Sequence, residues 1–351
     1  MATLSSLKNA LILSLLPFFK REKNHPMHPR RFLLVSTTAL GDTLWATPAI
    51  NALRNSFPNA FIGVLTSPIG YQVLQSLPAI NEIFLFASLF SLRKKLIKRK
   101  FDTVLIFHTS QRLALPLVST IGAAHIVGTT GINKGLDSLL TDLIAPSQCH
   151  EILRRLEIVE AAGGEKTSFQ LQYFPDSKDF LEIKTLFVQK HLNRKTPIIV
   201  LHPGSKDGYK RWPIEKYIVL GKTLRKKGFQ ILITGGKDED LLVQEVSSAI
   251  SGAIPINLPF HLFAALLTKV SLVITNDTGP MHLSLALHTP VIALFAPTDP
   301  TICGPYRTPL GHVIAKERTC TPCLKRKCRL PFCLLQITPE MIIKKVEEIL
   351  M

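Results

Sequence analysis

The sequence lacks the long apolar run of a membrane-spanning helix, because no stretch approaches the roughly 20 apolar residues that a bilayer requires. Aromatic residues are sparse, at 7% of the 351 residues, and zinc-finger spacing, heptads and a glycine–aromatic RNA-binding signature are missing. A glycine-rich dinucleotide fingerprint and a Walker loop are missing too. We therefore expect no membrane span and no nucleic-acid partner, and we expect any bound phosphate to be held by other loops.

Acidic residues are also scarce. The chain has 25 of them against 42 basic residues, a net charge of +17, which predicts an anionic partner such as a nucleotide or a phospholipid surface. Plain solubility is the alternative explanation of a basic surface. Six cysteines, five of them between 303 and 333, are too few and too clustered for a secreted disulfide framework, which favours a reducing compartment.

The N-terminal segment, residues 1–30, is both apolar and basic. Its apolar run Ala10–Phe19 is flanked by Lys8 and by Lys20, Arg21 and Lys23, and no small-residue cleavage site follows it. Two interpretations stay open, a short helix lying on an anionic membrane and a packed terminal helix. A second basic stretch, Ser91–Lys100, has six cations in ten residues and predicts either a solvated helix face or contact with lipid phosphates.

From residue 31 onward, short apolar β-branched runs alternate with helical patterns, which predicts an α/β fold with parallel sheets. Strands are expected at Arg31–Thr37, Phe61–Leu65, Thr103–Phe107, Ile198–Leu201, Phe229–Thr234, Leu272–Thr275 and Val291–Phe295. A break at 190–197 divides the pattern into a first domain, 31–192, and a second, 196–336. A closing helix within 337–351 begins at Pro339, with Thr338 as its N-cap.

Three polar loops follow strands of the second domain. They contain Ser205, Gly236 and Thr278, and the first loop continues to Lys210. Because parallel strands end at one edge of a sheet, we expect these hydroxyls, backbone N–H groups and the lysine to gather around one diphosphate. The alternative for Asp277 or Thr278 is an N-cap that only bonds helix N–H groups.

Taken together, several motifs resemble one known family. They are T-x-x-L-G-D-T-L-W-A-T-P-A after the first strand, H-P-G-S with K-R-W-P, G-G-x-x-E, and N-D-T-G-P-M-H followed by A-P-T-D-P. The sequence resembles glycosyltransferase family 9, the ADP-heptose:lipopolysaccharide heptosyltransferases, from about Arg31 to Leu350. The resemblance implies the GT-B architecture, two Rossmann-like domains facing a central cleft, with the acceptor bound by the first domain and the nucleotide sugar by the second.

The resemblance also implies roles for two catalytic residues. Asp42 matches the family's base, a carboxylate that takes the proton of the acceptor hydroxyl during inverting transfer. Without the family, Asp42 is better explained as the N-cap of a helix beginning at Thr43. Lys210 matches the lysine that offsets the charge developing on the leaving ADP.

The remaining predicted site residues bind substrate. Thr278, Gly279 and His282 match the diphosphate clamp, although a lone histidine here could instead be structural. The others are Ser205 beside the diphosphate, Asp277 near the donor sugar, Glu239 at the ribose, Leu258 beside the adenine, and Arg112 facing the acidic acceptor. The Arg112 match is loose, because His108-Thr109 replaces the usual Gln-Gly.

No cofactor is predicted, and no metal is assigned. Cys320, Cys323, Cys328 and Cys333 could form a four-thiolate zinc site, but only the first pair has ligand spacing, so free thiols are the favoured interpretation.

We therefore expect an inverting enzyme that moves heptose from ADP-heptose to the inner core of lipopolysaccharide, on Kdo-lipid A or heptosyl-Kdo-lipid A. The expected location is the cytoplasm, with peripheral contact to the anionic cytoplasmic face of a Gram-negative inner membrane. One alternative is a GT-B transferase of another nucleotide-activated sugar. The other is a catalytically inactive nucleotide-binding protein at the membrane, which would not need the Leu-Gly-Asp motif that this sequence retains.

Overall fold

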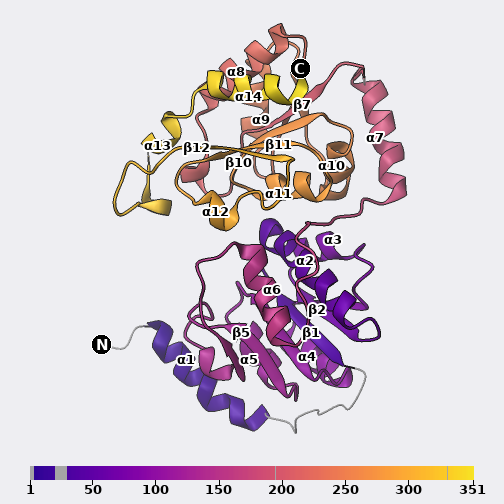
Figure 1. Ribbon diagram of the computed structural model, residues 1–351, viewed down its shortest axis with the longest axis vertical. Coiled ribbons are helices and arrows are strands. Elements are labelled where there is room, and N and C mark those ends of the chain that lie inside the picture. Colours follow the sequence, from indigo (N-terminus) through magenta and orange to yellow (C-terminus); the bar gives the residue numbers. More distant parts are fainter. Residues whose placement is uncertain (1–3, 20–29, 194, 330) are drawn as a thin grey trace. The chain divides into compact units, whose positions relative to one another are not determined.

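The computed structural model describes residues 4–19, 30–193, 195–329 and 331–351, shown in Figure 1. The chain divides into two compact units, 1–172 and 173–351. Lys20, Arg21 and Lys23, the cations expected beside the N-terminal apolar run, lie outside the described residues. Among the described residues, no helix is both long enough and apolar enough to cross a membrane.

The first unit alternates strands and helices as the apolar pattern predicts. Its strands are β1 (Arg31–Ser36), β2 (Phe61–Thr66), β3 (Glu82–Leu85), β4 (Thr103–His108), β5 (His125–Thr129) and β6 (Asp142–Ile144). Its helices are α1 (Leu4–Leu15), η1 (Leu16–Phe19), α2 (Leu40–Ser56), α3 (Pro68–Leu74), α4 (Leu89–Lys98), α5 (Ala114–Ser119), η2 (Asp137–Leu139) and α6 (Glu151–Ala161).

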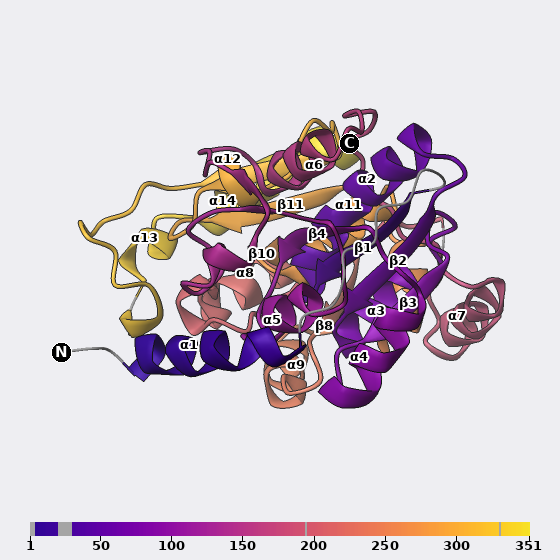
Figure 2. The ribbon, with the colours of Figure 1, turned by 90° about the horizontal axis from the view of Figure 1, so that it is seen from below.

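The six strands of the first unit form one parallel sheet in the order β3-β2-β1-β4-β5-β6. This is the doubly wound order of a Rossmann-like fold, in which the direction of strand addition reverses between β1 and β4 while all strands stay parallel. Figure 2 shows α2 and α6 on one side of the sheet and α4 and α5 on the other. The loops after β1 and β4 therefore flank the position where such folds bind ligands.

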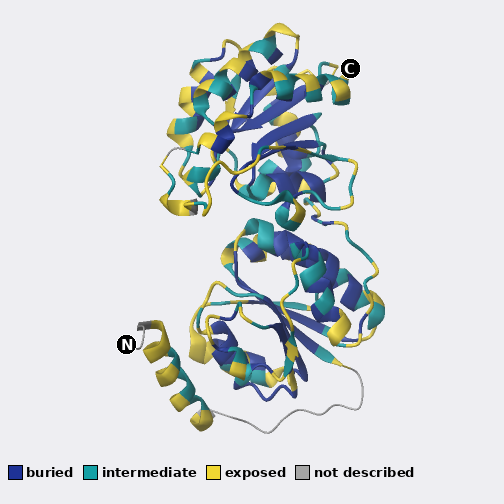
Figure 3. Ribbon diagram, turned by 60° about the vertical axis from the view of Figure 1, so that its left-hand side comes forward, coloured by how far each residue is buried: buried dark blue, intermediate teal, exposed yellow. Residues whose placement is uncertain are grey.

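Helix α1 packs on the outside of the first unit, on the side of α4 and α5 (Figure 2). Ile12 and Leu13 are half-buried against the apolar core beneath that side of the sheet, and Asn9 Nδ2 donates to the Lys134 carbonyl at 2.9 Å. Of the two interpretations of this segment, the structure thus shows the packed terminal helix. Its outward side remains exposed (Figure 3).

The second unit repeats the plan of the first. Its strands are β7 (Ile198–His202), β8 (Gln230–Thr234), β9 (Ile254–Ile256), β10 (Leu272–Asn276), β11 (Val291–Phe295) and β12 (Gly311–Ala315). Its helices are α7 (Ser177–Gln189), η3 (Gly208–Lys210), α8 (Ile214–Lys226), α9 (Asp240–Ser248), α10 (Phe260–Leu267), α11 (Gly279–Ala286), α12 (Pro300–Cys303), η4 (Lys325–Lys327), α13 (Phe332–Leu335) and α14 (Pro339–Leu350).

The second sheet is also parallel, with the order β12-β11-β10-β7-β8-β9. Relative to its own first strand, β7, this is the same doubly wound order as in the first unit. Its buried core includes side chains of α8, α9 and α14, while α11 lies between β10 and β11 in sequence and contacts both. The predicted α/β class with two Rossmann-like domains is confirmed.

The division between the units differs from the expected boundary at 190–197. Helix α7 was assigned to the first domain, 31–192, but it packs against α10 of the second unit. Tyr173 likewise meets Phe260 edge to face, with ring centroids 5.4 Å apart. Because α7 and Tyr173 contact residues much later in the sequence, the division between the units lies at 172/173, on the N-terminal side of the composition break at 190–197.

Candidate functional site

In the first unit, Asp42 lies where the loop after β1 enters α2. Helix α2 begins at Leu40, and its N-cap is Ala39, so Asp42 is the third helical residue. The interpretation of Asp42 as an N-cap is therefore wrong, because the helix begins three residues before Thr43. Its side chain is 25% exposed and its Oδ1 lies 3.7 Å from Nη2 of Arg155. The carboxylate is thus available at the ligand-binding position of the first sheet.

Two ion pairs on α6 lie beside this carboxylate. Glu151 accepts from Arg155 Nη1 at 2.7 Å and from Arg154 Nη1 at 2.6 Å. Burial raises the pKa of Glu151, but Arg155, with Arg154 and His108, outweighs this effect and the pKa lies below its ordinary value. At the end of β4, burial lowers the pKa of His108, although Asp42 opposes that shift. His108 is therefore neutral at physiological pH, and the carboxylates and guanidinium groups beside it carry the charge.

Arg112, the cation predicted to face the acceptor, lies on the loop between β4 and α5. Its Nη1 donates to Asn9 Oδ1 at 2.5 Å and its Nη2 donates to Ser5 Oγ at 3.0 Å, so both contacts go to α1. Lys134 extends into the same loop, where it donates to the Ser110 carbonyl. Burial and the neighbouring Arg112 lower the pKa of Lys134. An anion bound by Arg112 would have to replace the α1 contacts.

In the second unit, the three predicted loops follow β7, β8 and β10. These strands are neighbours in the parallel sheet, so the loops begin at the same edge. Asn276 links two of the loops. Its Nδ2 donates to the carbonyls of Pro203, at 2.8 Å, and Gly204, at 3.1 Å, while its Oδ1 accepts from the Trp212 backbone at 3.0 Å. Trp212 is fully buried, and its indole N–H donates to the Ile337 carbonyl. The K-R-W-P motif therefore anchors the loop that carries Lys210.

Lys210 is paired with the loop after β10. Its Nζ lies 2.5 Å from Asp277 Oδ2, and the same oxygen accepts from Thr298 Oγ1 at 2.7 Å. Burial lowers the pKa of Lys210, but the Asp277 carboxylate outweighs burial and the pKa is raised. The lysine is therefore charged. Asp277 does not act as an N-cap, since that position of α11 belongs to Thr278, whose side chain makes no capping bond.

Glu239 folds back over the loop after β8. Its Oε2 accepts from the Gly236 backbone at 2.7 Å, and its Oε1 lies 3.1 Å from Arg211 Nη2. A Cβ on Gly204 would come within 1.9 Å of this carboxylate, so only glycine permits the approach. Nearby, burial lowers the pKa of His202 to about 4, despite Glu239, and His202 is neutral. The carboxylate therefore joins the first two loops.

The other residues predicted to bind the nucleotide sugar lie along the same sheet edge. Thr278 and Gly279 begin α11, His282 is buried in that helix, Ser205 is buried in the loop after β7, and half-buried Leu258 follows β9. The residues predicted to bind the nucleotide sugar thus all lie in the second unit, while Asp42 and Arg112 belong to the first.

Sequence reasoning did not identify Arg155, Glu151, Arg211 or Thr298. A signal for Arg155 exists, because it falls among the buried residues Ile152, Leu156 and Val159 of an amphipathic helix. An arginine on the apolar face of a helix indicates a buried charge with a specific partner. Arg211 lies within the K-R-W-P motif, but the sequence does not reveal that it pairs with Glu239.

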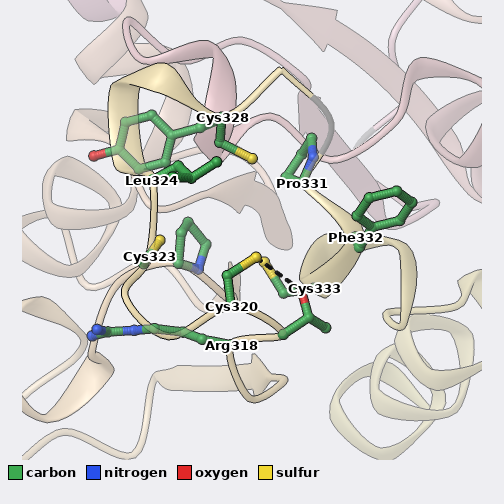
Figure 4. Close-up of a pocket in the computed structure, with 11 residues that line it drawn as sticks. Arg318, Cys320, Cys323, Leu324, Cys328, Pro331, Phe332 and Cys333 are labelled. Carbon is green, nitrogen blue, oxygen red and sulfur yellow. Dashed lines mark hydrogen bonds between the residues drawn. The ribbon is translucent and has the colours of Figure 1, made fainter.

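The cysteine cluster lies in the segment after β12 and borders the loop that carries Lys210, since Arg326 Nε donates to Asp207 Oδ1 at 3.0 Å. Cys320, Cys323, Cys328 and Cys333 line one small cavity of about 20 Å³ together with Tyr209 and Leu324 (Figure 4). All four are free thiols, and burial raises the pKa of Cys333. Within the described ranges, no group of three or more His, Cys, Asp or Glu side chains is arranged to hold a metal ion.

Comparisons with known proteins place these features in context. The model of the family described as glycosyltransferase family 9 (heptosyltransferase) matches residues 89–333. A lipooligosaccharide heptosyltransferase 2 from Campylobacter jejuni subsp. jejuni serotype O:2 is 24% identical over 89% of this chain and 96% of its own length.

Two solved structures share the fold. A family 9 glycosyl transferase from Veillonella parvula has a TM-score of 0.78 and 21% identity, covering 93% of this chain and 98% of its own. The E. coli ADP-heptose lipopolysaccharide heptosyltransferase II has a TM-score of 0.72 and 20% identity, covering 91% and 98%.

Proposed function

This chain belongs to glycosyltransferase family 9, the heptosyltransferases, and we propose that it moves heptose from ADP-heptose to the inner core of lipopolysaccharide with inversion at the anomeric carbon. The acceptor is Kdo-lipid A or its heptosylated form. The observation that carries this proposal is the cluster of loops at the carboxyl ends of β7, β8 and β10. It combines one charged lysine, a helix N-terminus and an acidic residue in the arrangement that a nucleoside diphosphate sugar requires.

We assign the binding of the donor to these loops. Lys210 and the N-terminus of α11, at Thr278 and Gly279, present positive charge and N–H donors to the diphosphate. Glu239 offers carboxylate oxygens to the ribose hydroxyls, and Leu258 offers an apolar surface to the adenine. Because Lys210 is bonded to Asp277 in the structure, the phosphates would share the ammonium group with that carboxylate.

In the proposed reaction, Asp42 accepts the proton of the acceptor hydroxyl while that oxygen bonds to the anomeric carbon. The bond from this carbon to the diphosphate oxygen breaks, and ADP leaves with the electron pair. Lys210 offsets the charge gained by the leaving oxygen. Since attack and departure occur on opposite faces of the sugar, the configuration inverts.

Incubating the purified protein with a panel of nucleotide sugars and Kdo-lipid A tests the function. We expect the mass of the acceptor to increase by one heptose only with ADP-heptose, and NMR of the product to show the inverted anomeric configuration. Transfer from a different nucleotide sugar alone would favour the other GT-B transferase. Binding of ADP-heptose without any transfer to Kdo-lipid A or heptosyl-Kdo-lipid A would favour the inactive binding protein.

We further propose that the enzyme works in the cytoplasm, at the anionic cytoplasmic face of the inner membrane. Helix α1 and η1 present an outward apolar stripe in which Leu7, Leu11, Leu15 and Phe18 are 59%, 63%, 50% and 83% exposed. Helix α4, on the same side of the first sheet, exposes Lys94, Lys95 and Lys98. Residues 1–31 have six cations and one acid, a net charge of 6 − 1 = +5. Apolar side chains beside clustered cations fit an anionic bilayer surface.

Replacing Leu7, Leu11 and Leu15 together by Gln should weaken binding to anionic vesicles about 100-fold, because each leucine would lose roughly 1 kcal/mol of apolar insertion. These side chains point away from the fold, so activity on a water-soluble acceptor should persist. Cosedimentation with vesicles containing phosphatidylglycerol measures the change. The wild type should detach in about 0.5 M salt, where the Debye length falls below about 5 Å.

The matched control is Ile12→Gln, which alters the inward side of the same helix. It should loosen α1 from the first unit and affect soluble activity more than the outward substitutions do, since Ile12 packs on the core. Equal binding of the wild type to neutral and anionic vesicles would contradict the electrostatic part of the proposal. Unchanged vesicle binding by the triple variant would contradict the role of the stripe.

A further inference from the structure

Arg155 is a fully buried charged residue next to the proposed base. Its side chain is 0% exposed, and it lies on the buried face of α6. Nη1 donates to both the carboxylate of Glu151, at 2.7 Å, and the Glu151 backbone carbonyl, at 2.8 Å. The guanidinium also lies over the Trp45 ring, 5.4 Å from its centroid. One side of the guanidinium is therefore fixed firmly.

The other side of the guanidinium is directed at Asp42. Nη2 lies 3.7 Å from Asp42 Oδ1, and among the described residues neither Nη2 nor Nε has a hydrogen-bond partner. A buried guanidinium with unused donors is costly, and an apolar residue of similar size would serve packing equally well or better. The arrangement therefore contributes something other than stability, and the group that it faces is the carboxylate of Asp42.

We propose that Arg155 is a positioning residue for sugar transfer, which orients the Asp42 carboxylate toward the acceptor hydroxyl. This inference rests on the proposed role of Asp42 as the base. A separation of 3.7 Å is an ion-pair distance but is longer than a hydrogen bond. Arg155 can thus attract the carboxylate electrostatically without occupying the lone pair that must receive the proton.

The charges around Asp42 set the expected pH dependence. Arg155 of α6 and His108 at the end of β4 interact with Asp42 directly, and Arg154 and Glu151 of α6 lie close to His108 as well. His108 is neutral because burial lowers its pKa. With Arg155 present the two guanidinium groups and Glu151 surround Asp42 with a net charge of +1, and without Arg155 these surroundings are neutral. Since a nearby positive charge favours the ionised form of a carboxyl group, loss of Arg155 should move the acid limb of the activity profile to higher pH.

The experiment compares Arg155→Met with Arg155→Lys, measuring kcat and KM from about pH 3.5 to pH 9, a range that includes the protonation of a carboxylate, after circular dichroism has confirmed folding. For Arg155→Met we expect kcat to fall by about 10- to 100-fold, a typical effect of a misplaced catalytic group, with little change in KM for ADP-heptose. The acid limb should move up by about one pH unit. Arg155→Lys keeps the charge, so its acid limb should stay near that of the wild type while kcat falls less.

The control is Lys166→Met, which removes another cation whose partner is on α6, here Glu160 at 2.7 Å on the surface. Its acid limb should match the wild type. If Arg155→Met does not fold, Arg155→Lys tests the proposal instead. A kcat of Arg155→Lys equal to that of the wild type across the pH range would overturn the positioning role. A wild-type kcat and acid limb in a folded Arg155→Met would overturn the proposal as well.

A double-mutant cycle separates this inference from the role of Asp42. If Arg155 acts through Asp42, adding Arg155→Met or Arg155→Lys to Asp42→Asn should cause little further loss of kcat. A further loss as large as that of the single substitution would show an independent role and overturn positioning. Near wild-type turnover in Asp42→Asn alone would instead refute Asp42 as the base.

Discussion

Replacing Asp42 by Asn should lower turnover by about 10² to 10⁴, the usual contribution of a general base, while leaving ADP binding nearly intact. The amide has the shape of the carboxylate but cannot take the acceptor proton. Asp42 is the third residue of α2 rather than its cap, so the helix should lose only a weak charge interaction at its N-terminus. Steady-state turnover and calorimetric ADP binding measure the two effects.

The matched control is Asp176→Asn, because Asp176 does cap a helix, with its Oδ1 accepting from the Lys178 backbone at 3.1 Å. That substitution should alter stability slightly and turnover hardly at all. Turnover of Asp42→Asn close to that of the wild type would remove Asp42 from the reaction.

Lys210→Ala should impair both donor affinity and turnover, by about 3 kcal/mol in total, the typical contribution of one electrostatic donor in an active site. The lysine is charged, since Asp277 raises its pKa against the effect of burial, and its loss leaves the diphosphate facing Asp277 without a counter-ion. Titration with ADP and single-turnover transfer from ADP-heptose separate the affinity loss from the rate loss.

Lys206→Ala provides the control, because Lys206 is an exposed lysine of the same loop. It should change both quantities little. A Lys210→Ala variant that is impaired only toward the acceptor would contradict the assignment of Lys210 to the leaving group.

The strands that the sequence predicts well are those buried on both faces. Ile198–Leu201 and Val291–Phe295 consist entirely of apolar residues, and the structure places β7 and β11 there almost to the residue. The strands that were missed, β3, β5, β6, β9 and β12, lie at or next to the sheet edges, are short or partly exposed, and lack a continuous apolar run. Their pairing depends on neighbours far along the chain.

The same reasoning explains the candidate site. The loops after β7, β8 and β10 could be predicted because each follows a recognisable strand and parallel strands end together. The pairing of Lys210 with Asp277 and of Arg211 with Glu239 could not, since each joins two loops whose side chains meet only in the folded unit. The docking of α1 on Arg112 joins residues more than a hundred positions apart and has no local signal.

The positions of the two tryptophans have a spectroscopic consequence. The chain has only two, and each unit contains one beside its proposed site: Trp45 under the guanidinium of Arg155, and Trp212 bonded to Asn276 two residues after Lys210. The chain therefore has one tryptophan, which can be excited apart from the five tyrosines, for each half of the reaction. A Trp45→Phe variant leaves emission that reports on the nucleotide loops, and a Trp212→Phe variant leaves emission that reports on the surroundings of the base, so occupancy of each half can be followed without an added label.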